Sequence, residues 1–93
     1  MVETTARVVI AHASRYLQQL CKHWAHKLDV TFTPEEGTVT FAEAVAVMRA
    51  EPEVLVVTIT AEDPSVLEQM KGVVASHLDR FAFKEAPLGF DWS

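Results

Sequence analysis

Residues 55–60, Leu-Val-Val-Thr-Ile-Thr, and the turn that follows them decide the fold. Leu55, Val57 and Ile59 recur at every second position, which is the period of a strand with one buried face. Asp63-Pro64 then supplies a helix N-cap and a proline at the first helical position. A strand followed directly by an amphipathic helix predicts a helix packed against a sheet.

The helix that begins at Asp63 extends to about Phe81 and carries a histidine on its apolar side. This side consists of Val66, Met70, Val73, Val74, His77 and Phe81. A buried imidazole needs a hydrogen-bond partner, because an unsatisfied polar group costs roughly 1–3 kcal/mol. His77 therefore predicts either a core histidine held by a backbone carbonyl, Tyr16 or water, or a ligand site. Gly72, in the same helix, would be explained by close packing at that point.

The upstream segments complete the element order β-α-β-β-β-β-α. Residues 4–11 are rich in β-branched side chains and predict a first strand, and Ser14 is a plausible N-cap for a helix that runs to about Lys27. Three further strands are expected at residues 29–33, 38–41 and 44–50. In the hairpin that the first two form, one face is expected to point toward the core: Val30, Phe32, Val39 and Phe41.

The predicted fold class is α+β, a two-layer sandwich with an antiparallel meander sheet and two helices on one face. The 93 residues make a single domain. Residues 87–92 predict an extended tail whose Phe90 and Trp92 fold back on the sheet edge, with a possible short C-terminal strand. The threonine-rich outer face of the sheet is then solvated or pairs with another subunit.

Composition restricts the classes of partner. The net charge of −5 argues against nucleic acid, whose affinity depends largely on phosphate neutralisation. The longest apolar run near the N-terminus, residues 8–11, is far shorter than a membrane span and does not resemble a signal peptide. We therefore expect a cytoplasmic protein with no membrane partner. Cys21 is the only cysteine, so no internal disulfide is expected.

The first helix carries two candidate sites. Arg15, Lys22 and His26 form a basic face that suits a small anionic ligand, although such a face is more often ordinary solvated charge. His23 and His26 are three residues apart and can share a metal ion. Cys21 points into the apolar stripe of the same helix, where a small buried hydrophobe is expected rather than a nucleophile.

A further candidate site lies between the helices and the sheet, around His77. The side chains that could contribute to a ligand pocket there are Tyr16, Trp24, Met70, Phe81 and Phe83. The acidic residues cluster at turns, and the sequence contains no phosphate-binding loop, serine-hydrolase motif or zinc-protease motif. No residue therefore indicates an enzyme, and the sequence identifies no particular cofactor.

Three stretches together resemble a known family: residues 13–27 (Ala-Ser-Arg-Tyr-Leu-Gln-Gln-Leu-Cys-Lys-His-Trp-Ala-His-Lys), the hairpin after them, and residues 77–85 (His-Leu-Asp-Arg-Phe-Ala-Phe-Lys-Glu). They resemble the bacterial domain of unknown function 2218 over nearly the whole chain. The resemblance implies a small, mostly stand-alone bacterial protein. It also implies a loose link to iron uptake, because the same domain occurs attached to siderophore-interacting flavoproteins. The matching motif positions are Tyr16, Leu20, Cys21, His23, His26, His77, Arg80 and Phe81, and none is an accepted catalytic residue.

Two functions from different classes follow. The first is a ligand-binding or accessory module for iron, haem or siderophore handling, with a small anionic or iron-containing ligand. The second is an interaction domain that forms a homodimer without a small ligand, through the outer sheet face, an exposed edge or the aromatic tail. A small enzyme that uses His77 or His23 as a base is a third reading.

Overall fold

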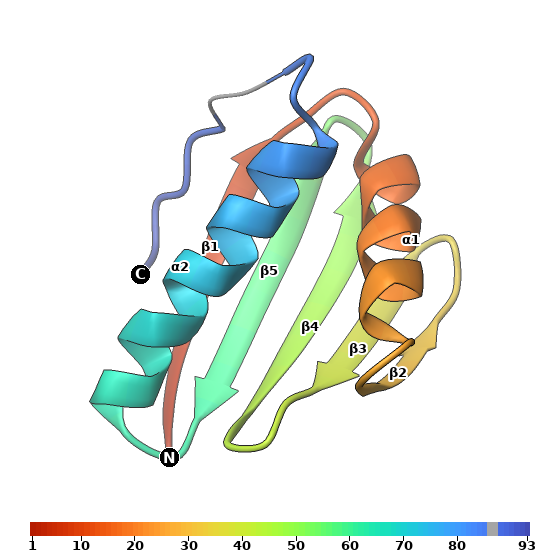
Figure 1. The fold of residues 1–93 in the computed structure, drawn as a ribbon. Helices are drawn as coiled ribbons and strands as arrows, with labels where there is room; N and C mark the ends of the chain where they lie inside the picture. The colour runs from red at the N-terminus through yellow and green to blue at the C-terminus, as the bar shows by residue number, and fades with distance from the viewer. Residues whose placement is uncertain (86–87) are drawn as a thin grey trace.

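The computed structural model describes residues 1–85 and 88–93. Its elements are β1 (Val2–Val9), α1 (Ala13–Trp24), β2 (Asp29–Phe32), β3 (Glu36–Thr40), β4 (Ala44–Glu51), β5 (Val54–Ala61) and α2 (Pro64–Phe81). The strands form one antiparallel sheet in the order β1-β5-β4-β3-β2, and both helices lie on the same face of it (Figure 1). The predicted two-layer α+β sandwich and the predicted element order are confirmed.

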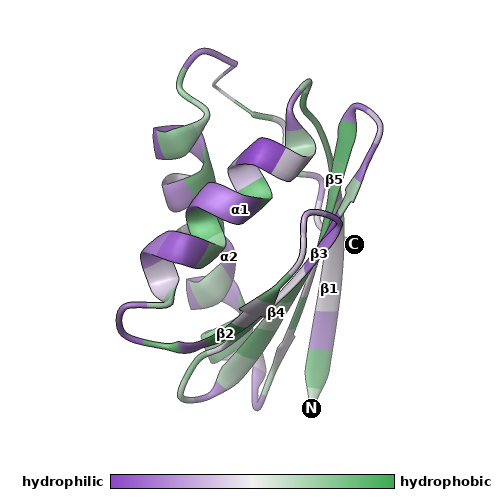
Figure 2. Ribbon diagram, turned by 90° about the vertical axis from the view of Figure 1, so that its right-hand side faces the viewer, coloured by the Kyte–Doolittle hydropathy of each residue, from purple (hydrophilic) through white to green (hydrophobic). Residues whose placement is uncertain are grey.

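The strand β5 lies inside the sheet, between the edge strand β1 and β4, and its two faces differ. Leu55, Val57 and Ile59 are fully buried beneath the helices. Figure 2 shows the hydrophilic residues of the helices on their outer sides and the hydrophobic sheet beneath them. Complete burial of such side chains contributes about 1.5–3 kcal/mol each. The alternation in the sequence therefore fixes which face of β5 meets the helices.

The side of α2 that enters the core is rotated from the predicted one. The buried residues of this helix are Leu67, Met70, Val74 and Leu78, whereas Val66, Val73, His77 and Phe81 are half-buried. Two leucines outside the predicted stripe thus take the central positions. His77 consequently lies at the flank of the helix that faces α1, instead of in the middle of the core.

The start of α2 agrees with the prediction, whereas the close packing predicted at Gly72 is not found. Asp63 is the N-cap, and its Oδ1 accepts a hydrogen bond from the backbone N–H of Val66 at 3.0 Å. Gly72 is exposed, and apart from its neighbours in the chain and the nearby backbone of α2, no heavy atom of the described residues lies within 4 Å of the position that a Cβ would occupy. Close packing therefore does not explain this glycine.

The helix α1 begins without the predicted Ser14 cap. Its N-cap residue is His12, which makes no side-chain capping bond, and Ser14 lies in the first turn with its Oγ donating to the carbonyl of Pro34 at 2.6 Å. A distant carboxylate lies at this end instead: Oε1 of Glu85 accepts the N–H of Ala11 at 2.7 Å. Negative charge near a helix N-terminus is favourable, so the segment after α2 stabilises the start of α1.

The end of α1 and the following hairpin lie close to their predicted positions. The helix ends at Trp24, three residues before the predicted end, because residues 25–27 form turns. In the hairpin, Val39 is fully buried, while Val30, Phe32 and Phe41 are partly buried and pack against the core. All four apolar positions therefore lie on the expected side.

The C-terminal residues cover the free edge of β1 (Figure 1). Ser93 donates to the carbonyl of Thr5 at 3.0 Å and accepts from the N–H of Thr5 at 3.1 Å. Phe90 and Trp92 stack with ring centroids 5.7 Å apart and pack against the core. The predicted return to the sheet edge is confirmed, although residues 88–93 form no strand. The predicted start of the tail, Pro87, lies outside the described residues. None of the helices among those residues is long and apolar enough to cross a membrane.

Candidate functional site

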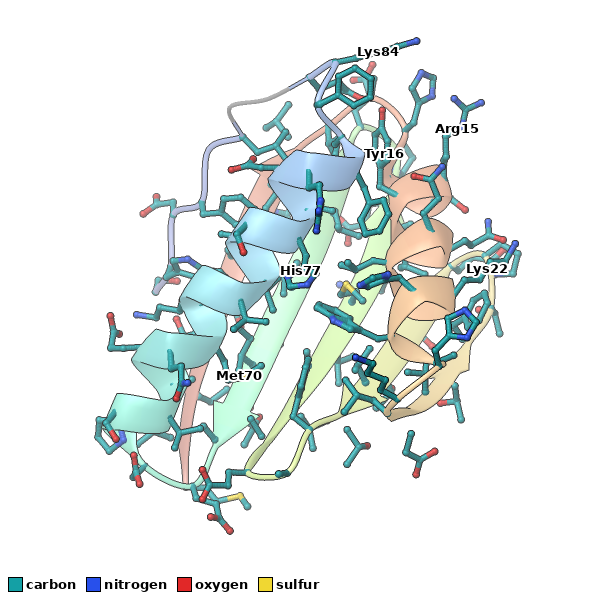
Figure 3. All side chains as sticks on the ribbon, viewed as in Figure 1. Arg15, Tyr16, Lys22, Met70, His77 and Lys84 are labelled. Atoms are coloured by element: carbon teal, nitrogen blue, oxygen red, sulfur yellow. The ribbon has the colours of Figure 1, made fainter. Side chains whose placement is uncertain are left out.

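Aromatic and imidazole rings meet where α1 and α2 lie side by side. His77 of α2 lies between elements, with its ring centroid 5.3 Å from that of Trp24 and 5.6 Å from that of His23. Phe81 meets His23 edge-on at 5.4 Å, and Phe41 meets Trp24 edge-on at 5.2 Å. Figure 3 shows His77 pointing from α2 toward α1. The two helices are therefore joined by a ring cluster, and His77 is at its centre.

One nitrogen of His77 already has a partner. Its Nδ1 lies 2.7 Å from the carbonyl oxygen of Val73, one helical turn earlier. Because a carbonyl oxygen only accepts, Nδ1 carries the proton, and Nε2 of the neutral ring carries the lone pair. The backbone carbonyl was one of the partners expected for this residue. It satisfies one side of the ring and leaves the other available.

A groove of about 510 Å³ runs along the outer side of this cluster. It is lined by Gln19, Lys22, His23, His26, Arg80, Phe81 and Phe83, and we call it the α1–α2 groove. Lys22 and Arg80 carry permanent positive charge, and no carboxylate lines the groove, so its local charge favours an anion. Phe83 is 69% exposed and offers an aromatic face at the rim. The volume is typical of small-molecule sites, about 300–1,000 Å³.

A larger cavity, of about 630 Å³, lies at the N-terminal end of α1 and has a different charge. Arg15 lines it together with three carboxylates, those of Glu35, Glu51 and Glu53. Glu51 is paired with Arg7 and Arg49, at 3.1 Å each. Glu35 and Glu53 still outnumber Arg15 among the lining residues, so this cavity is a poor anion site. Arg15 also borders a shallow cavity of about 330 Å³ that Lys22 shares. We therefore place the candidate site in the α1–α2 groove, where charge and aromatic surface coincide.

The predicted site residues divide between the core and the groove. Tyr16, Trp24 and Met70 are buried in the core. His23, His26, Lys22 and Phe81 line the groove, whereas Arg15 does not. Within residues 1–85 and 88–93, no group of three or more His, Cys, Asp or Glu side chains is arranged to hold a metal ion. Lys22 and His26 of the predicted basic face thus share one surface with His23, and Arg15 lies outside it.

Two groove residues, Arg80 and Gln19, were missed by the reasoning from periodicity and motifs. Arg80 lies in the last turn of α2, where a cation is ordinary because it complements the helix dipole. Only the family resemblance singled it out. Its position opposite α1 depends on how the two helices pack, and a single helix pattern carries no such information.

The titratable groups behind the groove have structural explanations. Burial raises the pKa of the Cys21 thiol to about 11, so the thiol is protonated at neutral pH and is a poor nucleophile. Burial, followed by the negative charge of Glu85, raises the pKa of Tyr16. Cys21 is fully buried, as expected for a small apolar residue. Neither group points to chemistry at the groove.

Comparison with known proteins agrees with this fold. The chain is similar to the NMR structure of PA4090 from Pseudomonas aeruginosa, with a TM-score of 0.85 and 35% sequence identity; the match covers 100% of this chain and 96% of that one. No protein among the curated ones matches. Residues 5–93 match the family described as uncharacterized protein conserved in bacteria (DUF2218). Because that match spans nearly the whole sequence, the chain belongs to this family of uncharacterised bacterial proteins.

Proposed function

We propose that the protein is a small binding module that takes an aromatic, iron-containing anion in the α1–α2 groove. One observation carries the proposal: Lys22 and Arg80 line a groove that holds no carboxylate, in a protein whose overall charge is −5. Two positive side chains without a nearby carboxylate repel each other, and this arrangement is unexpected in a protein with a negative net charge. An anionic ligand explains it.

The aromatic part of the ligand is inferred from the walls of the groove. Phe81 and the exposed Phe83 lie beside Arg80, an arrangement that suits a flat ring bearing negative charge. Complexes of iron with catecholate siderophores, and haem with its two propionates, share this chemistry.

The family resemblance supports the link to iron. Several of its motif positions come from opposite ends of the chain and line the same groove: His23, His26, Arg80 and Phe81. The domain's occurrence beside siderophore-interacting flavoproteins supports iron chelates as the class of ligand. We infer an accessory role in iron, siderophore or haem handling, in which the groove holds the ligand without transforming it.

Calorimetric titration with 2,3-dihydroxybenzoate, its ferric complex and haem tests the proposal. Arg80→Gln, Lys22→Gln and Phe83→Ala are each expected to weaken binding about 5- to 30-fold, because a partly exposed charge-assisted or stacking contact contributes roughly 1–2 kcal/mol. Arg15→Gln is the matched control, since Arg15 lies outside the groove, and it should bind like the unmodified protein. Equal losses in the control and groove variants, or no binding of any probe, would overturn the assignment.

A homodimer is a second candidate, favoured by the uncovered face of the sheet. Val9 is 77% exposed and Val47 is 40% exposed on this face, near the half-buried Val54 and Val56. A second copy of the chain on this face would remove these side chains from water. Analytical ultracentrifugation tests the idea. A dimer that Val47→Lys dissociates supports it, and a monomer at high protein concentration contradicts it.

A further inference from the structure

We propose that the outer side of α1, from Arg15 to the α1–α2 groove, is a docking surface for an acidic, extended segment of a partner protein. The inference goes beyond the proposed function, because it concerns a protein partner and a surface that reaches past the groove. The two share Lys22, Arg80 and the aromatic rim of the groove. They differ at Arg15, so they can fail separately.

The basic side chains of this surface have no acidic partners. Arg7 and Arg49 pair with Glu51 on the uncovered face of the sheet, and Lys71 pairs with Glu68 within α2. The other lysines and arginines form no ion pair with a described residue: Arg15, Lys22, Lys27, Arg80 and Lys84. All of these lie in α1, in the turns after it, or at and just after the end of α2. Uncompensated positive charge is thus confined to the helix pair.

The chain places its acidic residues away from this surface. Residues 13–28, which comprise α1 and the turns after it, contain none of the 13 acidic side chains. Two carboxylates at and after the end of α2 accept backbone hydrogen bonds instead: Asp79 from Leu88 at 3.1 Å, and Glu85 from Ala11 at 2.7 Å. The positive surface therefore persists in a protein whose net charge is −5, and a partner with acidic side chains complements it.

Two cavities form a continuous path along α1. The α1–α2 groove and the shallow cavity of about 330 Å³ share Gln19 and Lys22 in their linings, and the shallow cavity extends the path to Arg15. No carboxylate lines either of them. Arg15 and Lys22 are about two helical turns apart, so they lie on the same side of α1 with about 10 Å between them along the axis. An extended peptide spans this distance with about three residues.

Arg15 distinguishes this surface from the groove alone. It is exposed and does not line the groove. It also borders the acidic cavity with Glu35 and Glu53, but it forms an ion pair with neither. Figure 3 shows its side chain pointing away from the body of the protein. A small ligand in the groove is not expected to reach Arg15, whereas an extended segment would contact both Arg15 and Lys22.

The far end of the path is aromatic, which favours a protein partner. Phe83 is 69% exposed at the rim of the groove, beside Phe81 and Arg80. An aromatic side chain at one end of the segment can pack against Phe83, as anchor residues do in protein interfaces. The net charge of −5 disfavours nucleic acid, whose negative charge is much denser than that of an acidic peptide.

Calorimetric titration with a synthetic peptide tests the proposal. The peptide has a tryptophan at one end, followed by alternating glutamate and serine, and both ends are blocked. A control peptide has glutamine in place of every glutamate. The acidic peptide should bind, and the control peptide should not. Raising NaCl from about 0.05 M to about 0.3 M should weaken binding, because exposed charges are screened.

Variants of the protein locate the surface. Arg15→Gln, Lys22→Gln and Arg80→Gln should each weaken binding of the acidic peptide about 1.5- to 5-fold, and the triple variant about 4- to 100-fold, as expected for exposed ion pairs. Arg49→Gln is the matched control. It changes the net charge by the same amount, but Arg49 lies on the uncovered face of the sheet, so this variant should bind like the unmodified protein.

Several results would overturn the docking surface. These are no binding of the acidic peptide at about 1 mM, equal binding of the glutamine peptide, or equal weakening by Arg49→Gln and the surface variants. Tighter binding of an oligothymidylate of the same charge would assign the surface to nucleic acid instead. An unchanged affinity in Arg15→Gln would restrict binding to the groove and refute the extended path.

The same titrations separate this inference from the proposed function. Arg15→Gln should weaken binding of the acidic peptide but not of 2,3-dihydroxybenzoate. If the small ligands bind and the peptide does not, the proposed function stands and the docking surface fails. If the peptide binds and none of the small ligands does, the docking surface stands and the proposed function fails.

Discussion

Replacing Gly37 with alanine should destabilise the protein through one contact. Gly37 lies in β3 beneath α1, and a Cβ there would stand 2.6 Å from Sγ of Cys21 and 3.4 Å from Cδ2 of Leu17. The first distance is roughly 1 Å shorter than favourable contact between such atoms. Cys21 is fully buried, and its Sγ can move only by rotation about the Cα–Cβ bond. The sulfur therefore cannot move without meeting other core atoms. The clash must therefore displace α1 or force Cys21 from its rotamer.

The expected loss follows from this geometry. Gly37 has no positive φ, so the cost arises from the added methyl group and not from the backbone conformation. Overpacking of a filled core costs about 1–3 kcal/mol. For a domain of this size, each kcal/mol lowers the Tm by roughly 4–8 °C. We expect Gly37→Ala to melt roughly 5–20 °C below the unmodified protein.

A double-mutant cycle with Cys21→Ala isolates the cause. Urea unfolding of both single variants and the double variant gives the coupling free energy between the two positions. Cys21→Ala alone should be destabilising because it leaves a small cavity, but it also removes the sulfur that the new methyl group would meet. The double variant should therefore be more stable than the sum of the single effects predicts. Effects that add to within about 0.5 kcal/mol would refute the Sγ contact as the cause.

Three further predictions test other parts of the structure. Gly72→Ala should stabilise the protein by about 0.5–1 kcal/mol in urea unfolding, because the position is exposed and helical and a Cβ meets nothing; a loss of stability would contradict this. Hydrogen bonds from the first turn of α2 lower the pKa of Asp63, so its stabilising effect should be present above the unfolded pKa of about 3.9 and be lost as the pH falls through the lower folded value. Asp63→Asn should flatten the acid side of the stability profile, and an unchanged profile would count against the cap. Glu85→Gln should lower the pKa of Tyr16, since a nearby negative charge is removed; Tyr16 is the only tyrosine, so an absorbance titration that shows no change would refute the interaction.

The elements of the fold could be predicted because their signals are local. The alternation of Leu55, Val57 and Ile59 defines a strand, and Asp63-Pro64 defines a helix start, whatever the rest of the chain does. The contacts at the start of α1 could not be predicted in this way. The carboxylate near this end comes from Glu85, more than 70 positions after the Ala11 N–H that it accepts, and Ser14 has the residue type of a cap but donates to a loop carbonyl instead.

The orientation of α2 exposes a second limit of periodicity. Apolar residues occupy more than one side of this helix, so the pattern admits several stripes within about 40° of one another. Contact with the sheet selects the stripe that contains Leu67 and Leu78. That small rotation moves His77 from the predicted core to the interface with α1. The sequence was therefore enough to single out His77, whereas its position beside α1 could be seen only in the packed structure.

The candidate site depends on distances that no sequence pattern contains. His23 and His26 are three positions apart in sequence, and helical geometry predicts their relation even though the helix ends at Trp24, between them. His23 and His77 are related by the packing of two helices on a sheet, and only the structure shows their rings 5.6 Å apart. The same packing places Arg80 in the groove beside His23. A function based on this surface is thus a property of the helix pair, which makes substitutions at its two sides, Lys22 and Arg80, the informative comparison.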